Sequence, residues 1–288
     1  MAPKEQASTK KTVGVCLTPA LIGQFDVANS VVVIIDILRA TTSMCVAIDN
    51  GVEALLPVLT VEECRTYREH GYLIAAERNG EQVEGFDFGN SPYSYMGSEI
   101  KGRKVAMSTT NGTHALNAAR EHNAKEIVIG AFSNISVLVD YLIERNENIL
   151  LLCAGWKNRP NLEDTIFAGA MVKRLRGNFV LDEDTALIAE TLFKMANRRK
   201  RYYMNNSSHY HRIVYTLQIQ KDVKYALRKD THQVIPILVG DHLFNLDGRK
   251  TYPSSAKPVT GKGKKTHQKN DAQPNLNPKE PKAGTTES

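Results

Sequence analysis

Polar residues that can do chemistry directly follow an apolar run in the first part of the chain. The run 31–35 consists of β-branched residues only, which predicts a strand covered on both faces. A carboxylate, a guanidinium and two hydroxyls come next, at Asp36, Arg39, Thr41 and Thr42. Open α/β sheets bind ligands beyond the carboxyl ends of strands, where Asp36 can hold a hard cation and Arg39 can grip an oxyanion. The alternative is that Asp36 caps the next helix and Arg39 is a solvated surface charge.

Further acids stand after other predicted strands or open a helix. Together with the first acid they form a set of four carboxylates, Asp36, Glu77, Glu163 and Asp164. Ligation by oxygen alone suits Mg²⁺ and disfavours zinc, which prefers nitrogen and sulfur. Glu163 and Asp164 can instead complement a helix dipole as first-turn acids. As neighbours on a helix they do not share a face, so we expect one of the two to reach the site.

Two features favour an anionic, phosphate-like ligand. The turn 109–113, Thr-Thr-Asn-Gly-Thr, joins a predicted strand to a helix, where hydroxyls and unpaired backbone N–H groups can hold an oxyanion. Arg39 and Arg78 follow equivalent strand ends and can clamp two anionic groups of one small molecule. The alternatives are a helix-capping turn, and structural ion pairs of the arginines with Asp36 or Glu77. The turn lacks the spacing of a nucleotide P-loop, so we do not predict ATP binding.

Strands and helices alternate along the part of the chain that carries these residues. Apolar runs predict strands at 13–17 (an edge strand), 31–35, 54–59, 73–76, 104–107, 126–129, 149–153 and 234–238. Helical patterns lie at 43–50, 61–70, 114–122, 135–146, 162–175, 182–201, 207–217 and 222–227, and 80–92 reads as a long loop. This alternation predicts an α/β fold with a mostly parallel sheet flanked by helices. The C-terminal half is more helical and can form a second lobe.

Composition divides the chain into a catalytic unit with two polar tails. We expect a flexible leader at 1–12, an α/β catalytic region at 13–155, a helix-rich second half of the same unit at 156–246, and a disordered basic tail at 247–288. The net charge of +6 comes from these tails, because the tail 247–288 holds nine Lys and Arg against four Asp and Glu. A near-neutral body, with Tyr252 the only aromatic residue of the tail, argues against nucleic acid as the partner.

Neither a membrane nor a disulfide is expected. No apolar run is long enough to span a bilayer, and 1–12 lacks the apolar segment of a secretory signal, so the predicted location is cytoplasmic. The four cysteines are far apart, without a Cys-x-x-Cys pair, which favours buried thiols over disulfides or zinc. The sequence leaves homo-oligomerisation open.

Several stretches taken together resemble the 2-phosphosulfolactate phosphatase family. The matching blocks are 36–42, 77–78, 85–92, 109–113, 130–134, 153–155 and 162–165, in that order. The resemblance implies a Mg²⁺-dependent phosphatase of coenzyme M biosynthesis, which releases phosphate from 2-phospho-3-sulfolactate. It departs at 207–210, where Ser-Ser-His-Tyr stands in place of the Ser-Arg-His-Gly typical of the family. Anion recognition is altered if that segment contacts substrate.

The resemblance and the residue chemistry together predict the site. The metal ligands are drawn from Asp36, Glu77, Glu163 and Asp164, and the catalytic residues are Asp36, Arg39, Glu77 and Asp164. The predicted substrate-binding residues are Arg39, Thr41, Thr42, Arg78, Asn90, Ser91, Thr109, Thr110, Asn111, Gly112, Thr113 and Asn134. The expected partner is a small anionic phosphorylated substrate. The alternatives are a phosphatase for another small phosphorylated hydroxy acid, and a non-catalytic sensor of anionic metabolites.

Overall fold

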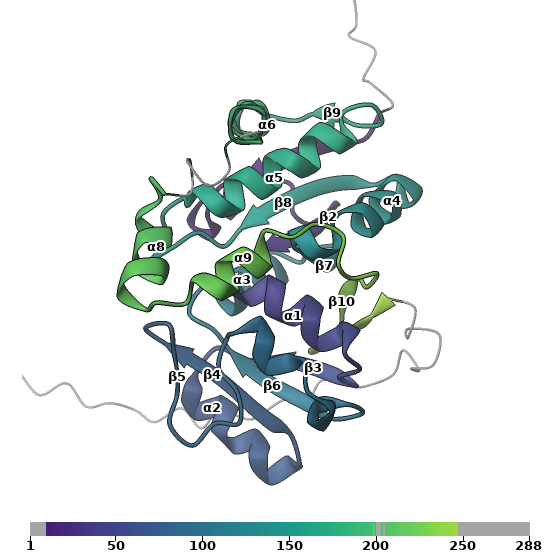
Figure 1. Ribbon diagram of the computed structural model, residues 1–288. Coiled ribbons are helices and arrows are strands. Elements are labelled where there is room, and N and C mark those ends of the chain that lie inside the picture. Colours follow the sequence, from purple (N-terminus) through teal and green to yellow (C-terminus); the bar gives the residue numbers. More distant parts are fainter. Residues whose placement is uncertain (1–9, 198, 200–202, 204, 247–288) are drawn as a thin grey trace, which may run out of the picture. The chain divides into compact units, whose positions relative to one another are not determined.

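The computed structural model describes residues 10–197, 199, 203 and 205–246, which all belong to one compact unit. Its strands form one sheet in the order β5-β4-β6-β3-β11-β10-β7-β2-β8-β1-β9 (Figure 1). The strands are β1 Thr12–Cys16, β2 Ser30–Ile35, β3 Ala54–Pro57, β4 Leu73–Arg78, β5 Glu81–Gln82, β6 Lys104–Ser108, β7 Glu126–Gly130, β8 Asn148–Cys153, β9 Val180–Leu181, β10 Pro236–Val239 and β11 His242–Asn245. The fold is therefore α/β with a large, mostly parallel sheet, as predicted.

Strand β2 lies in the parallel block β7-β2-β8-β1-β9. Val33 pairs with Val128 of β7 on one side and with Leu151 of β8 on the other. All six residues of β2 are buried, which is why its sequence is a continuous apolar run and not an alternating one. The second parallel block, β4-β6-β3, is joined to the first by the antiparallel hairpin β10–β11.

Helices cover the sheet, and the figure shows where they lie. α4, α5 and α6 pack side by side, and α5 contacts β8, β1 and β2, while α1 packs against β3, β7, β10 and β11 (Figure 1). The helices are α1 Ala40–Asp49, α2 Val61–Thr66, α3 Gly112–Glu121, α4 Ile135–Arg145, α5 Leu162–Leu175, α6 Asp184–Ala196, α8 Ser208–His211 and α9 Gln220–Ala226, with a π-helix at Arg212–Thr216. Short 3₁₀ helices lie at Pro19–Gln24, Tyr67–His70, Pro92–Tyr95, Ser98–Ile100 and Phe132–Asn134.

Three sequence predictions need correction at the level of strands. The predicted edge strand at 13–17 is β1, which pairs with β8 and also with the two-residue strand β9, too short to leave a pattern. The loop 80–92 contains the short strand β5. The predicted last strand at 234–238 is only half of a hairpin, because β11 follows it and inserts beside β3. Gly240, with φ +61, makes the tight turn that the local pattern did not identify.

The hairpin β10–β11 also joins the second half of the chain to the sheet. Because β10 pairs with β7 and β11 with β3, residues after 230 complete the middle of the sheet. The helix-rich second half is thus built into the same compact unit, and the predicted leader 1–9 and tail 247–288 lie outside the described residues. Within the described parts, none of the helices is long and apolar enough to cross a membrane.

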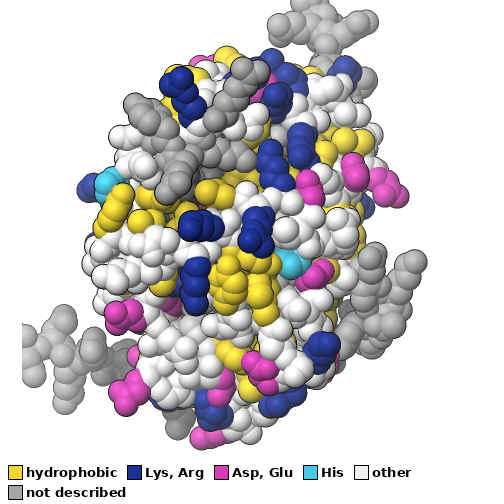
Figure 2. Space-filling view, viewed as in Figure 1, with side chains coloured by type: hydrophobic (Ala, Val, Ile, Leu, Met, Phe, Trp, Pro, Cys, Tyr) yellow, Lys and Arg dark blue, Asp and Glu magenta, His cyan; other side chains and the backbone are white. Residues whose placement is uncertain are grey.

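The described surface and the cysteines agree with the composition. Figure 2 shows Lys and Arg side chains gathered around α9 and above it, with Asp and Glu side chains nearer the margins of the same face. All four cysteines are buried and free, as predicted. Burial raises the pKa of Cys45 to about 12, so this thiol stays protonated and packs as a small apolar group.

Candidate active site

Strand ends from both parallel blocks meet at one small cavity of about 100 Å³. In Figure 1 the arrows of β4, β6 and β8 point toward the side on which α8 lies. The segments that follow these strands and β2 form the walls, and α8 with the start of the π-helix completes them. The lining residues are Asp36, Leu38, Glu77, Asn79, Asn90, Thr109, Thr110, Asn111, Trp156, Lys157, His209 and Arg212.

Asp36 is the buried acid of this cavity. It follows β2 directly, is 4% exposed, and its backbone N–H donates to Thr41 Oγ1 at 3.0 Å. Burial raises the pKa of Asp36 to about 6; the nearby carboxylates of Glu77 and Glu163 act in the same direction, and His209 and the Ala40 amide oppose them. A carboxylate held this way is costly to ionise, and a bound cation would relieve that cost.

The first turn of α3 approaches Asp36 closely. A Cβ atom on Gly112 would lie 2.6 Å from Ala40 Cβ and 3.1 Å from Asp36 Oδ2, so only glycine fits between α3 and the start of α1. Thr109 Oγ1 accepts from the Thr113 amide at 3.2 Å, which satisfies one of the free N–H groups of this helix end. The turn 109–113 therefore caps α3 and, through Thr109, Thr110 and Asn111, lines the cavity as well.

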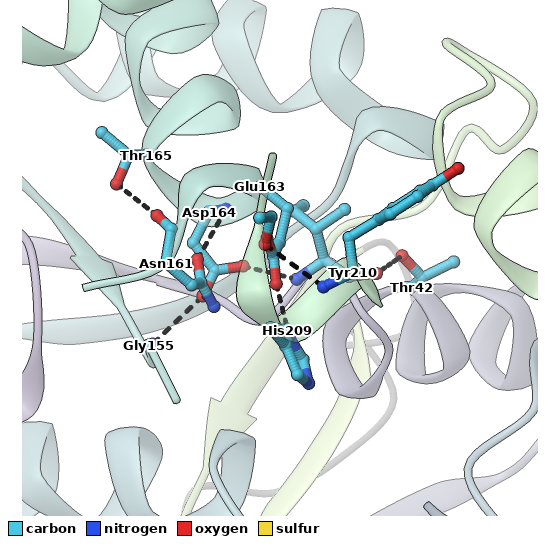
Figure 3. A network of polar contacts seen from close by, with 10 residues as sticks. Thr42, Gly155, Asn161, Glu163, Asp164, Thr165, His209 and Tyr210 are labelled. Atoms are coloured by element: carbon cyan, nitrogen blue, oxygen red, sulfur yellow. Dashed lines mark hydrogen bonds and ion pairs between the residues drawn. The ribbon is translucent and has the colours of Figure 1, made fainter. Parts of the chain in front are cut away.

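Glu163 and His209 form a buried pair that reaches the cavity through the imidazole. Glu163 is fully buried at the start of α5, and its Oε1 accepts from His209 Nδ1 at 2.5 Å. Ser207, the N-cap of α8, donates its hydroxyl to the other carboxylate oxygen at 3.1 Å. Figure 3 shows Glu163 pointing toward His209. The pair fixes one ring nitrogen and leaves Nε2 of a cavity-lining histidine free to exchange a proton.

Asp164 has a different, structural environment. Its Oδ1 accepts from the Ile37 amide at 2.9 Å, and its Oδ2 accepts from the Gly155 amide at 3.1 Å and from the Asn161 side chain at 2.9 Å. Figure 3 shows dashed lines from Asp164 to Asn161 and Gly155. Burial, with the nearby acids Asp36 and Glu163, raises its pKa. Asp164 thus ties the segments after β2 and β8 to α5.

The predicted arginine clamp is not what the structure contains. Arg39 is 5% exposed, and its guanidinium donates to Asp222 at 2.6 Å and to the Gly80 carbonyl at 2.9 Å. A buried guanidinium needs such partners, and this pairing occupies both terminal nitrogens of Arg39. Arg78 is exposed and donates to the Glu77 carbonyl at 2.8 Å, outside the cavity lining. The expected partner of Arg39, Asp36 or Glu77, is also wrong, because the partner is Asp222.

Other predicted binding residues hold the backbone. Thr41 accepts from Asp36 N–H, and Thr42 donates to the Ile37 carbonyl at 2.9 Å. Ser91 donates to Asp222 at 3.1 Å, and the Asn134 side chain bonds Ala131, Ile129 and Val234. The predicted residues that line the cavity are Asp36, Glu77, Asn90, Thr109, Thr110 and Asn111, whereas Arg39, Thr41, Thr42, Arg78, Ser91, Gly112, Thr113, Asn134, Glu163 and Asp164 do not.

The cations that do line the cavity come from elsewhere in the chain. Lys157 Nζ lies 5.1 Å from the ring centre of Trp156, and the guanidinium carbon of Arg212 lies 5.9 Å from it. The same indole stacks on His209, with 5.5 Å between the ring centroids and 20° between the planes. In the described parts of the chain neither Lys157 nor Arg212 forms an ion pair, so both charges are free to meet an anion.

The four predicted metal ligands are not assembled as one centre. Among the described residues no three His, Cys, Asp or Glu side chains are grouped in a way that could hold a metal ion. Asp36 and Glu77 line the cavity together, whereas Glu163 and Asp164 are occupied by His209 and by backbone amides. Asn90 Oδ1, in the same cavity, is buried and has no hydrogen-bond partner within the described structure. It is an oxygen acceptor that awaits a donor or a cation.

A buried acid, a Glu–His pair and cations that have no ion-pair partner among the described residues lie beyond the strand ends of this α/β fold, and they suit a small anionic ligand. The profile of the family described as 2-phosphosulpholactate phosphatase matches residues 16–241. A probable 2-phosphosulfolactate phosphatase of Thermotoga petrophila is 40% identical over 207 residues, which cover 72% of this chain and 88% of that protein. Proteins with the same description from Clostridium acetobutylicum and Caldanaerobacter subterraneus are 33% and 30% identical, covering 73% and 75% of this chain and 90% and 91% of theirs.

The chain belongs to the 2-phosphosulfolactate phosphatase family, as its motifs predicted. By class it is a phosphoric monoester hydrolase. The alternative prediction of a non-catalytic sensor of anionic metabolites is therefore wrong.

The residues that sequence reasoning missed are those brought in by distant parts of the chain. Asn79, Trp156, Lys157, His209 and Arg212 line the cavity, but none of them directly follows a predicted strand. The only local signal was at His209, inside the segment 207–210 that departs from the family pattern.

Proposed function

We propose that this enzyme hydrolyses the phosphate monoester of 2-phospho-3-sulfolactate to 3-sulfolactate and phosphate, with Mg²⁺ as its cofactor. The observation that carries the proposal is that one cavity holds a buried acid, a Glu-supported histidine and free cations, as a trianionic ester requires. The family membership supports the same reaction. The cytoplasmic location and the coenzyme M pathway stay predictions from the sequence.

In the proposed reaction, water attacks phosphorus and the bond between phosphorus and the C2 oxygen breaks. Water gives up a proton, and the leaving oxygen gains one. His209 suits the second transfer, because Glu163 orients the ring through Nδ1 while Nε2 has no hydrogen-bond partner among the described residues. Thr109, Thr110 and Asn111, at the N-terminus of α3, orient the phosphoryl oxygens. We assign Glu163 to positioning, since it acts through His209.

The oxygen donors of the cavity fit Mg²⁺. Asp36 and Glu77 would hold the ion together with the unpartnered Oδ1 of Asn90, and Mg²⁺ needs only one or two protein carboxylates when water and phosphate complete its shell. When bound, the ion would neutralise negative charge on the phosphoryl oxygens. Glu163 and Asp164 are left out of this ligand set, because neither lines the cavity and both oxygens of each carboxylate already accept hydrogen bonds.

One departure from the family pattern favours a second candidate within the same class. Ser208 and Tyr210 stand in the segment whose His209 lines the cavity, and Tyr210 is buried. A changed wall next to His209 favours a different leaving group, so the alternative substrate is another small phosphorylated hydroxy acid. The reaction and the metal would be the same.

The test is a phosphate-release screen with the purified full-length chain. The substrates are 2-phospho-3-sulfolactate, 2-phospholactate, phosphoglycolate and ethyl phosphate, each with Mg²⁺ and with chelator. We expect the highest kcat/KM on 2-phospho-3-sulfolactate and no turnover after metal removal. A higher value on 2-phospholactate would favour the alternative substrate, and full activity in chelator would rule out the metal.

A further inference from the structure

We propose that Lys157 and Arg212, held on the aromatic platform that the Trp156 ring provides, bind the anionic group on the leaving half of the substrate and set its specificity. This inference rests on the proposed phosphatase reaction, and it names the residues that select the substrate. The ligand chemistry is a carboxylate or sulfonate close to the carbon that bears the leaving oxygen. The phosphoryl group itself is assigned to the opposite wall, near Asp36 and the start of α3.

The first argument is the place of the platform relative to the proton donor. Trp156 stacks on His209 with 5.5 Å between their centroids, and Lys157 Nζ and the Arg212 guanidinium lie 5.1 and 5.9 Å from the same indole. If His209 protonates the leaving oxygen, that oxygen lies beside the same indole ring that both cations contact. In a 2-phospho acid the carboxylate is attached to the carbon that bears this oxygen, so it falls within their reach.

The second argument is that the two cations are available. Arg39 is buried against Asp222, and Arg78 donates to a carbonyl. Lys157 and Arg212 line the cavity, and in the described structure they contact the face of an aromatic ring and no carboxylate. A cation over an aromatic face is oriented but keeps its charge for a ligand.

The third argument is that the loop carrying the platform is fixed. Trp156 and Arg159 bond each other's backbones, with 2.8 Å from Trp156 N to Arg159 O, and Gly155 and Lys157 have positive φ angles of +65 and +53. A Cβ on Gly155 would lie 2.4 Å from the Arg159 carbonyl oxygen. Arg212 begins the π-helix, a rare form of helix that occurs most often at functional sites. These features place Trp156 and Arg212 at defined positions beside the cavity.

There is also room for a second anionic group. A neighbouring cavity of about 160 Å³ shares Thr110, Asn111 and Lys157 with the first and is further lined by His114. Lys157 therefore stands between the two spaces. A substrate whose phosphoryl group lies at the start of α3 can extend its other end past Lys157 into this space.

The experiment compares charge-removing variants on substrates that differ only in the leaving half. The variants are Lys157→Gln and Arg212→Gln, with Arg159→Gln as the control that removes one exposed positive charge from the same loop outside the cavity. The substrates are ethyl phosphate with no second anion, 2-phospholactate with a carboxylate, the phosphate ester of 2-hydroxyethanesulfonate with a sulfonate, and 2-phospho-3-sulfolactate with both.

We expect Lys157→Gln and Arg212→Gln to lower kcat/KM about ten- to a hundred-fold on substrates with a second anion, mainly through KM. On ethyl phosphate the loss should stay within about threefold, and Arg159→Gln should match the wild type throughout. The substrate with the larger loss identifies the group that each cation holds. Equal losses on ethyl phosphate would overturn the assignment, because the cations would then hold the phosphoryl group, and unchanged kinetics on every substrate would overturn it as well.

Two further measurements separate this inference from the proposed reaction. Trp156→Phe should retain selectivity and Trp156→Leu should lose it, because only the aromatic ring offers a face to both cations; equal behaviour of the two would remove the platform from the assignment. Binding of 3-sulfolactate, measured by calorimetry, needs no turnover. Weaker binding by Lys157→Gln and Arg212→Gln would support the inference even if wild type releases no phosphate, and unchanged binding would overturn it even if wild type is active.

Discussion

One buried arginine and a pair of cations beside the cavity lie near the strand ends, and they have opposite roles. Arg39 follows β2 and is 5% exposed, and both ends of its guanidinium are bonded, to Asp222 and to the Gly80 carbonyl. Lys157 and Arg212 come from a loop and a π-helix, and they rest on the face of Trp156 inside the cavity wall. The first site holds the fold together, and the second presents charge to a ligand.

The difference follows from burial. A buried arginine needs carboxylate or carbonyl oxygens as hydrogen-bond partners in place of water. Once its N–H groups donate to such partners, few of them remain to bind a substrate. A cation at the edge of a cavity can share an aromatic face with a neighbour and remain available. Position at a strand end therefore predicts that a residue lies near the cavity, whereas the partners of its side chain decide whether its charge is available to a substrate.

The largest effect should come from removing the imidazole beside the free cations. His209→Gln should lower kcat by about 10²–10⁴, because it deletes the proposed proton donor, whereas Glu163→Gln keeps a hydrogen bond to the ring and should lose less. The measurement is steady-state phosphate release with Mg²⁺. His211→Gln is the matched control, since His211 is exposed two residues away and lies outside the cavity lining. Similar losses in both histidine variants would point to damage of α8 and not to proton transfer.

The sharpest test of the comparison itself is Arg39→Gln. It should lower the free energy of unfolding by about 3–5 kcal/mol, because Asp222 is left buried without its partner. Arg212→Gln should change the same quantity by less than about 0.5 kcal/mol, since it breaks no ion pair in the described chain. Urea unfolding followed by circular dichroism measures both.

A double variant tells the structural role of Arg39 from a catalytic one. Arg39→Met with Asp222→Leu should recover part of the lost stability, because a buried pair replaced by apolar groups leaves no lone charge. If Arg39→Gln keeps the wild-type free energy of unfolding but has a raised KM, the roles assigned to Arg39 and to Lys157 with Arg212 would be reversed.

Sequence alone predicted which strand ends contribute residues to the cavity, but not the partners of those residues. The polar residues after β2, β4 and β6 do line one cavity, because the carboxyl ends of the strands in both parallel blocks lie at the same edge of the sheet. The partners could not be found in the same way. Asp222 lies 183 residues after Arg39, and His209 lies 46 residues after Glu163, so no local pattern joins them.

The same limit explains the errors in the fold. The continuous apolar run of β2 predicted its central place, whereas β9 has two residues and β11 follows a turn at Gly240 that the pattern did not mark. Thr41 and Thr42 were expected to bind a ligand, but their hydroxyls satisfy backbone groups of Asp36 and Ile37. A threonine hydroxyl next to a turn readily forms hydrogen bonds with the backbone of that turn, and it is then not available to a ligand.

Asp36→Asn should raise stability while removing most activity, and the gain should depend on pH. The folded pKa of about 6 lies above the ordinary value of 3.8, so the unfolded chain releases this proton first as pH rises. The wild type therefore loses stability between about pH 4 and pH 6, and above that range the full cost is about 3 kcal/mol at 1.4 kcal/mol per pKa unit. Asparagine cannot ionise and avoids that cost.

Thermal unfolding in chelator across pH 4–8 measures the effect. The difference between Asp36→Asn and wild type should vanish near pH 4 and be largest above pH 6. Mg²⁺ should narrow the difference by stabilising the ionised wild-type carboxylate. A pH-independent difference would mean that the gain does not come from ionisation.

The smallest effect is expected for a substitution of Arg78. This substitution tests whether an exposed arginine after a strand end contributes to neither stability nor substrate binding. Its guanidinium donates to the Glu77 carbonyl at 2.8 Å and approaches Ser108 Oγ at 3.4 Å, which is long for a hydrogen bond. Arg78→Ala should therefore change the free energy of unfolding by less than about 1 kcal/mol and kcat/KM by less than about threefold. The companion is Arg39→Ala, which removes the same side chain from a buried ion pair and should be far less stable. If Arg78→Ala instead raises KM tenfold on the sulfonate substrate alone, Arg78 swings into the cavity when substrate binds. Arg78, the exposed arginine, would then belong with the cations that bind the ligand, and Arg39, the buried one, with those that stabilise the fold.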